Sequence, residues 1–158
     1  YKRQLFQLGS FQKEGGKWSI GTDSQINLNP LEEFRMLDYG QRTKTHDRAQ
    51  FTSKNELNAG KFAIDMAWHN GRTAMGEKKS NFLTVGDCLD AVIINANTPL
   101  ISVSKPENIL TTLVYSGQPN DLIGTLLNGQ WLIKKQKHIN QEEIQNSFVK
   151  SICQMKIR

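Results

Sequence analysis

The sequence predicts an α/β fold, and two observations predict it. Residues 17–42 have the pattern of a strand, an acidic turn and a capped helix. Between residues 80 and 138 the pattern changes to short strand-like runs, with a tight hairpin expected at Asn128-Gly129. A chain of 158 residues can bury one ordinary core, so one domain or two small lobes are expected.

The strand-turn-helix pattern places a carboxylate at the end of a strand. An apolar run from Trp18 to Gly21 stops at the turn Thr22-Asp23-Ser24. In parallel α/β folds ligands gather at the carboxyl ends of strands, so Asp23 is a candidate catalytic residue. The alternative is that Asp23 only forms the turn or caps the next helix, because Asp, Ser and Asn favour both positions.

Two helices flank this strand. The spacing of apolar residues predicts a short helix within residues 5–14, ended by the glycine pair at 15–16. After the turn, Asn29 is the expected N-cap of a second helix, with Pro30 at its first position and Glu32 placed for a capping box.

Two more helices are predicted farther along the chain. One begins at Ser53, where Glu56 completes a capping box, and ends near residues 69–71. The last begins near Asn140. Its apolar stripe is expected to pack against the protein and consists of Ile144, Phe148, Ile152 and Met155.

Strands are predicted between these helices. Residues 82–87, 91–95 and 110–115 are short apolar runs of the kind that form strands. Asn128-Gly129 separates two further runs and supplies the positive φ angles of a type I′ turn, which predicts a hairpin.

Composition and charge argue against several function classes. The net charge is +5, but basic residues are scattered among acids and only residues 134–138 form a dense basic run, so no nucleic-acid partner is expected. No run approaches 18 apolar residues, so no membrane span is expected. Cys88 and Cys153 lack a CxxC spacing and predict reduced cysteines in a soluble, cytoplasmic protein, with a disulfide between them left open. The arginines Arg35, Arg42 and Arg48 are expected on a solvated face.

Residues 19–42 also resemble a known family. The motifs that carry the resemblance are GTDS at 21–24, NPLEEFR at 29–35 and YGQR at 39–42. In this order they are similar to the last barrel strand and following helix of the amidohydrolase superfamily, in particular of formimidoylglutamate deiminases. The run GRTAMGEKK at 71–79 and the hairpin segment also resemble this superfamily.

The resemblance implies that the chain is the C-terminal portion of a metal-dependent hydrolase. Residues 1–76 would supply the last strand and flanking helices of a (β/α)8 barrel, and residues 77–158 a small composite β-sandwich with a terminal helix. A complete barrel takes about 250 residues, so the other barrel strands are expected upstream. The sandwich strands are expected to pair with strands of that missing N-terminal segment.

The resemblance also implies a chemistry for Asp23. In this superfamily a divalent metal, usually zinc, is held by histidines that include an H-x-H pair, and the Asp of the last strand binds or borders it and shuttles the proton of its water. Asp23 matches that Asp and is the expected catalytic and metal-binding residue. The histidines of this sequence, His46, His69 and His138, all follow Asp23 and form no H-x-H pair. The chain alone is therefore expected to be inactive and not to retain the metal.

The implied reaction is hydrolysis of N-formimidoyl-L-glutamate to N-formyl-L-glutamate and ammonia, a step of histidine degradation. Two alternatives stay open. The same fold could act on another substrate, as in imidazolonepropionase, guanine deaminase or triazine hydrolase, or the chain could be a non-catalytic packing or dimerisation module in which Asp23 is only a cap. The expected partners are a small-molecule substrate and the missing N-terminal barrel segment, and a homodimer is left open.

Overall fold

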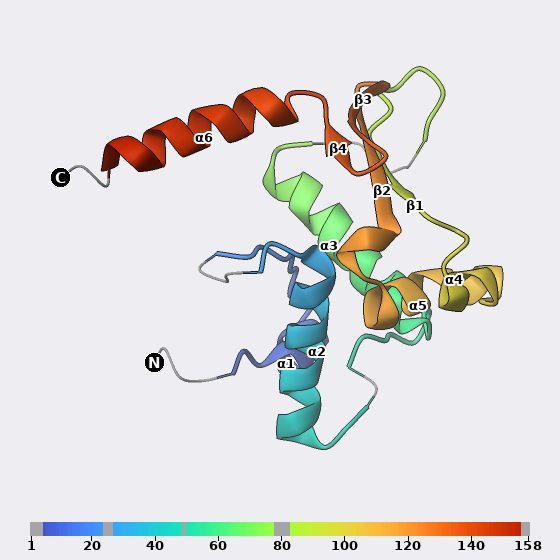
Figure 1. Cartoon of the computed structure of the whole chain (residues 1–158). Helices are drawn as coiled ribbons and strands as arrows, with labels where there is room; N and C mark the ends of the chain where they lie inside the picture. Colours follow the sequence, from blue (N-terminus) through green and yellow to red (C-terminus); the bar gives the residue numbers. More distant parts are fainter. Residues whose placement is uncertain (1–4, 24–26, 49, 78–82, 156–158) are drawn as a thin grey trace. The chain divides into compact units, whose positions relative to one another are not determined.

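The structure is a computed structural model that describes residues 5–23, 27–48, 50–77 and 83–155. The chain forms two compact units, each made of two separate stretches (Figure 1). The first unit comprises Tyr1–Phe82 and Ala96–Pro119, and the second comprises Leu83–Asn95 and Asn120–Arg158. The described helices and strands form a mixed helix and sheet fold, as the sequence predicts. The division into a barrel part and a sandwich part stays a prediction.

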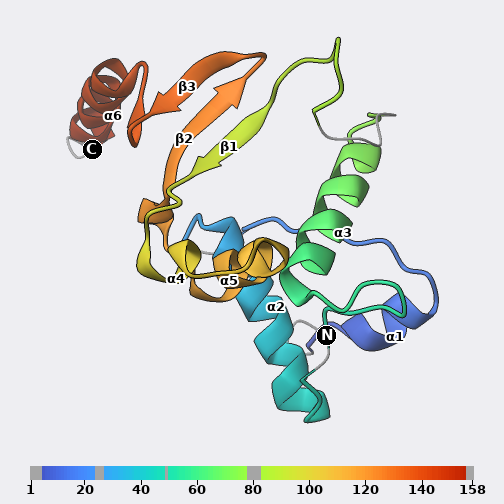
Figure 2. The same cartoon turned by 90° about the vertical axis from the view of Figure 1, so that its right-hand side faces the viewer.

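The first unit is helical. Its helices are α1 (Leu8–Lys13), α2 (Pro30–Thr45), α3 (Ala59–Ala74), α4 (Pro99–Ser102) and α5 (Ile109–Ser116), with a 3-10 turn, η1 (Pro106–Asn108), before α5. Helix α5 lies against both α2 and α3, as Figure 1 and Figure 2 show. The buried cluster at the centre of this unit consists of Leu8, Trp18, Phe34, Phe51, Ala63, Ala67 and Val114.

The predicted strand at Trp18–Gly21 is not a strand in this structure. Within the described residues, this segment pairs with no other strand, and a lone extended segment cannot form a hydrogen-bonded ladder. The segment instead makes polar contacts with α3, which are described below.

The third predicted helix begins later than expected. Ser53 closes a turn, because its Oγ accepts hydrogen bonds from the backbone N–H groups of Asn55 and Glu56 at 3.2 and 3.1 Å. Helix α3 begins at Ala59, after Asn58, whose side chain accepts from the backbone N–H of Lys61. The helix start was predicted too early because a serine followed by a glutamate three residues later occurs in turns as well as in capping boxes.

The predicted strand at residues 110–115 was wrong, because this run lies in helix α5. The run consists of apolar residues and threonine, and its periodicity alone is compatible with either a helix or a strand. The helix is selected by its packing: Leu113 and Val114 are buried, and the backbone of α5 approaches α3 closely at Gly60. A Cβ atom on Gly60 would lie 2.4 Å from the carbonyl carbon and oxygen of Leu110.

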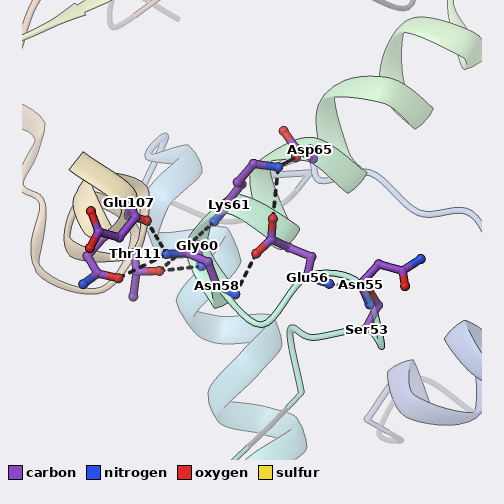
Figure 3. A network of polar contacts seen from close by, with 10 residues as sticks. Ser53, Asn55, Glu56, Asn58, Gly60, Lys61, Asp65, Glu107 and Thr111 are labelled. Carbon is purple, nitrogen blue, oxygen red and sulfur yellow. Dashed lines mark hydrogen bonds and ion pairs between the residues drawn. The ribbon is translucent and has the colours of Figure 1, made fainter. Parts of the chain in front are cut away.

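Polar side chains fasten the start of α3 to α5 (Figure 3). The Oγ1 of Thr111 accepts from the Gly60 N–H at 3.0 Å and donates to Oδ1 of Asn58 at 2.6 Å. The Nδ2 of Asn58 donates to the backbone carbonyl of Glu107 at 2.6 Å. The residue that caps α3 therefore also joins it to the helix packed against it.

The second unit is a four-stranded antiparallel sheet followed by a helix. Its strands, in the spatial order β1-β2-β3-β4, are β1 (Ala91–Ile94), β2 (Leu122–Leu127), β3 (Gln130–Lys134) and β4 (Lys137–His138), and β1, β2 and β3 lie side by side in Figure 2. The 3-10 turn η2 (Pro119–Asp121) precedes β2, and α6 (Gln141–Met155) follows β4.

The hairpin predicted at Asn128-Gly129 is confirmed. Leu127 pairs with Gln130, and the two turn residues have φ angles of +50° and +73°. The strand predicted at residues 82–87 was wrong over its described part, where the backbone turns with φ angles of +47° at Leu83 and +92° at Gly86. Phe82 lies outside the described residues.

The last predicted helix is confirmed, but its apolar stripe is not packed as expected. None of the residues of α6 is buried, and Phe148 is 64% exposed. Gly124 is the single buried residue among those that the structure describes in the second unit. No helix in the described part of the chain is long and apolar enough to cross a membrane.

Candidate functional site

Trp18 anchors the segment that leads to Asp23. Its side chain is 6% exposed, and its ring stacks on that of Phe51 with centroids 5.6 Å apart. The indole Nε1 donates a hydrogen bond to Oε1 of Gln12 at 3.1 Å, which satisfies the one polar atom that the ring buries. Aromatic burial of this kind fixes the backbone at the start of the segment.

The same segment is tied to the second half of α3. The Oγ of Ser19 donates to the backbone carbonyl of Ala67 at 2.9 Å, and Nδ2 of Asn70 donates to the carbonyl of Trp18 at 3.1 Å. The Asn70 contact pairs the backbone carbonyl of Trp18, which no sheet partner pairs, and the Ser19 hydroxyl adds a side-chain contact to α3. Asp23 follows four residues after this anchored stretch.

Asp23 lies in an exposed turn. Its φ angle of +43° is in the left-handed region, where asparagine and aspartate are among the few common non-glycine residues. It is not the cap of α2, because Oδ1 of Asn29 accepts from the backbone N–H of Leu31 at 3.1 Å. Residues 24–26 lie outside the described residues, and the catalytic and metal-binding role of Asp23 stays a prediction.

Helix α2, which follows this turn, is fixed to the residues after α5 by an arginine. Nη2 of Arg35 donates to the backbone carbonyl of Gly117 at 3.0 Å, and Nε donates to the carbonyl of Leu31 at 3.1 Å. The Arg35 side chain is 13% exposed. The prediction of a solvated Arg35 was therefore wrong, whereas Arg48 is exposed.

A buried carboxylate forms the second contact between α2 and α5. The side chain of Asp38 is 0% exposed, and its Oδ2 accepts from Nη2 of Arg42 at 2.6 Å and from the Tyr115 hydroxyl at 2.8 Å. The Arg42 guanidinium lies 5.4 Å from the centroid of the Tyr115 ring and 5.8 Å from that of Tyr39. Arg42 thus pairs with a buried carboxylate, while its own side chain is 35% exposed.

This environment shifts the pKa values of Tyr115 and Arg42. Burial raises the pKa of the Tyr115 hydroxyl well above its usual value, and its hydrogen bond to Asp38 raises it further. Burial opposes the charge of Arg42, but the hydrogen bond and negative charge of Asp38 outweigh it and raise the pKa of Arg42. Oδ1 of Asp38 and Nε of Arg42 are buried without a hydrogen-bond partner among the described residues. The three groups join α2 to α5.

The histidines are placed separately. His46 follows the last turn of α2 with a φ angle of +59°, and His69 is exposed with its ring 4.6 Å from that of Trp68. In β4, Nδ1 of His138 accepts from the backbone N–H of Asn140 at 3.1 Å. Within the ranges that the structure describes, no three histidine, cysteine or acidic side chains gather into a metal site.

A catalytic zinc site normally takes three protein ligands, so the described residues do not form one. Asp23 is exposed and can offer one carboxylate. Any metal that it serves would need its other ligands from outside the described residues.

The cluster of Asp38, Arg42 and Tyr115 was not predicted from the sequence. Its local signal was present, because Asp38 and Arg42 are spaced four residues apart on a helix, where opposite charges meet. Tyr115 lies 77 residues from Asp38 in the sequence, and no local pattern connects the two.

No protein-family model matches the chain. The chain is 25% identical over 151 residues to a formimidoylglutamate deiminase of Pseudomonas aeruginosa, a match that covers 96% of this chain and 33% of that protein. It is 28% identical to a 5-methylthioadenosine/S-adenosylhomocysteine deaminase of Dictyoglomus turgidum, over 81% of this chain and 29% of that protein. A protein of the same description from Halothermothrix orenii is 29% identical, over 83% of this chain and 30% of that protein.

The fold is similar to a solved structure. The crystal structure of an amidohydrolase from Brucella melitensis matches 97% of this chain and 33% of that chain, with a TM-score of 0.82 and 23% identity. The resemblance predicted from residues 19–42 is thereby confirmed: the chain resembles a portion of amidohydrolase-superfamily enzymes, formimidoylglutamate deiminase among them. The chain spans about a third of the length of the curated relatives it matches.

Proposed function

We propose that this chain is the C-terminal part of a hydrolytic deaminase that converts N-formimidoyl-L-glutamate and water to N-formyl-L-glutamate and ammonia. The observation that carries the proposal is the match to the Pseudomonas formimidoylglutamate deiminase, which extends over 96% of this chain. The two sequences are 25% identical over the 151 aligned residues, so the choice of substrate rests on this similarity and on the motifs around Asp23.

The exposure of Asp23 and the anchoring of the segment before it support the proposed role. Its carboxylate is exposed, and the segment before it is held by buried Trp18 and by the contacts of Ser19 with α3. In the proposed reaction Asp23 accepts a proton from the attacking water and returns it to the nitrogen that leaves as ammonia. A positioned carboxylate can do both, because the proton it gains in the first step is the one it gives up in the second.

The proposed enzyme contains a divalent cation, zinc in the family that the sequence resembles, which would lower the pKa of the attacking water. Asp23 is the one residue of this chain that we assign to it. The remaining ligands belong to the upstream part of the enzyme, and the isolated chain is proposed to be inactive.

The second unit is proposed to be one part of a composite β-sandwich. Its four strands form a single layer, and a sheet needs a second packed layer to bury an apolar face. Residues 1–76 are proposed to belong to the barrel and residues 77–158 to the sandwich, with strands from the upstream segment completing it.

A second candidate activity is favoured by the other relatives. Two of the matches described above are 5-methylthioadenosine/S-adenosylhomocysteine deaminases, at 28% and 29% identity. Hydrolytic deamination of an adenine nucleoside would also release ammonia and would use Asp23 in the same role. The two candidates differ in the substrate pocket, which this chain does not complete.

An ammonia-release assay distinguishes the candidates. The gene product that contains this chain is incubated with N-formimidoyl-L-glutamate or with 5-methylthioadenosine, and ammonia is measured. We expect release from the first substrate, and Asp23→Asn should lower kcat by about 10²–10⁴-fold, the usual contribution of a general acid or base. Glu14→Gln is the matched control, because it removes an exposed carboxylate after α1 and should leave the rate unchanged.

The assay outcomes distinguish the two candidate activities and test the role of Asp23. Release from 5-methylthioadenosine alone would select the second candidate. Full activity of Asp23→Asn on either substrate would assign Asp23 to the turn alone and remove its proposed role.

A further inference from the structure

Helix α6 presents an apolar stripe that the described residues of its own unit leave exposed. The stripe has the spacing of one helix face and consists of Ile144, Phe148, Ile152 and Met155. Ile144 is 52%, Phe148 64% and Met155 71% exposed, and none of the fifteen residues of α6 is buried. In Figure 1 the helix extends away from β4, without folding back on the sheet of its own unit.

The sheet of the second unit is uncovered as well. Val92 is 57%, Leu127 51% and Trp131 41% exposed, and no apolar side chain that the structure describes in this unit is buried. A two- to four-stranded sheet and one helix are stable when their apolar faces pack on another layer. Both elements therefore require a surface from outside the described unit.

We propose that the α6 stripe docks onto an apolar surface of the upstream two thirds of the same enzyme, in the way a helix lies in an apolar groove. The inference rests on the proposed function, because it takes the chain to be part of a longer protein. Its support is the length of the relatives: each match covers 81–96% of this chain but only 29–33% of the relative. A large part of a protein of that size is thus available to cover the helix.

The residues that flank the stripe favour docking on the upstream part of the same enzyme over pairing with a second copy of the chain. Helices that pair with copies of themselves select their partner through charges that flank the apolar seam. At 100° per residue, the positions that flank this stripe are Gln145, Ser147 and Ser151, which are uncharged. The charged residues Glu142, Glu143 and Lys150 lie toward the opposite face. Uncharged flanks of this kind suit packing within one protein.

Hydrogen exchange of α6 tests the proposal. The amides of α6 are compared in the 158-residue chain and in the full gene product, each as wild type, as Phe148→Ser and as Val149→Ser. Val149 is the matched control, because it is 58% exposed on the same helix but points about 100° away from Phe148. Sedimentation of the 158-residue chain measures self-association in the same samples.

We expect α6 to exchange at least 100-fold more slowly in the full gene product than in the isolated chain, which should sediment as a monomer. Phe148→Ser should remove most of this protection, and Val149→Ser should retain it. Three results would overturn the proposal. They are equal exchange rates of α6 in the two proteins, equal effects of the two variants on exchange, and a dimer of the isolated chain that depends on Phe148. A protected helix without deaminase activity would reject the proposed function alone, and activity with an unprotected helix would reject the docking alone.

Discussion

Gly60→Ala is expected to destabilise the chain, although the same change stabilises most helices. Gly60 lies in the first turn of α3, where α5 crosses it at close range. Alanine would gain about 1 kcal/mol in helix propensity relative to glycine. Its Cβ, however, would lie 2.4 Å from Leu110 backbone atoms and from the Cα of Thr111, so the two helices would have to move apart.

The magnitude follows from what this movement disrupts. Overpacking of a core contact costs about 1–3 kcal/mol, and here the clash is with backbone that cannot rotate away. The hydrogen bond from the Gly60 N–H to Thr111, 3.0 Å long, would lengthen, which costs about 1 kcal/mol more. After the gain in propensity, the free energy of unfolding should fall by about 1–3 kcal/mol.

Urea and thermal unfolding of the 158-residue chain measure this change, followed by circular dichroism. Each kcal/mol should lower Tm by about 2–4 °C in a chain of this length. Gly40→Ala is the control: it is also in a helix, but its Cβ would meet only the flexible tip of Leu5 at 3.3 Å, so it should be neutral or stabilising. A Gly60→Ala chain as stable as Gly40→Ala would refute the reasoning, because the close approach of α3 and α5 would then not exist in solution.

Two further predictions concern α2 and its contacts. Because the pKa of Tyr115 is raised in the folded chain, its contribution to stability is complete below the pKa of a free tyrosine, about 10, and is lost as pH rises above that value. At pH 7, Tyr115→Phe should therefore lower the free energy of unfolding by about 1.5–3 kcal/mol, because Asp38 loses a hydrogen bond. Between pH 9 and pH 11 the variant should lose less stability than the wild type. Parallel curves of unfolding free energy against pH for the two proteins would contradict this. Asn29→Ala should lower the free energy of unfolding by about 0.5–2 kcal/mol through loss of the α2 cap, measured by urea unfolding, whereas Asn27→Ala, which changes an exposed asparagine before the cap, should have little effect.

The parts of the fold that were predictable depend on neighbours in sequence. Asn29 and Pro30 set the start of α2 through a hydrogen bond two residues away and a fixed φ angle. Asn128-Gly129 sets its hairpin through two positive φ angles. Such features are determined within four residues, so the sequence alone specifies them.

The parts that were not predictable depend on distant residues. The run at 110–115 could form a helix or a strand, and its close packing on Gly60, fifty residues earlier in the sequence, selects the helix. The segment at Trp18–Gly21 needs a neighbouring strand that the described residues do not supply. At the candidate site, Asp23 was predicted from the resemblance of its surrounding motifs, whereas Asp38 and Tyr115 came together only through the packing of α2 on α5.

The backbone at Asp23 restricts which residues can replace it. Its φ of +43° costs most side chains about 1 kcal/mol or more, but glycine, asparagine and aspartate tolerate it. A change to asparagine therefore removes the charge and keeps the turn, while a change to alanine or glutamate also strains the loop. Loss of the carboxylate at this site is thus compatible with an intact turn.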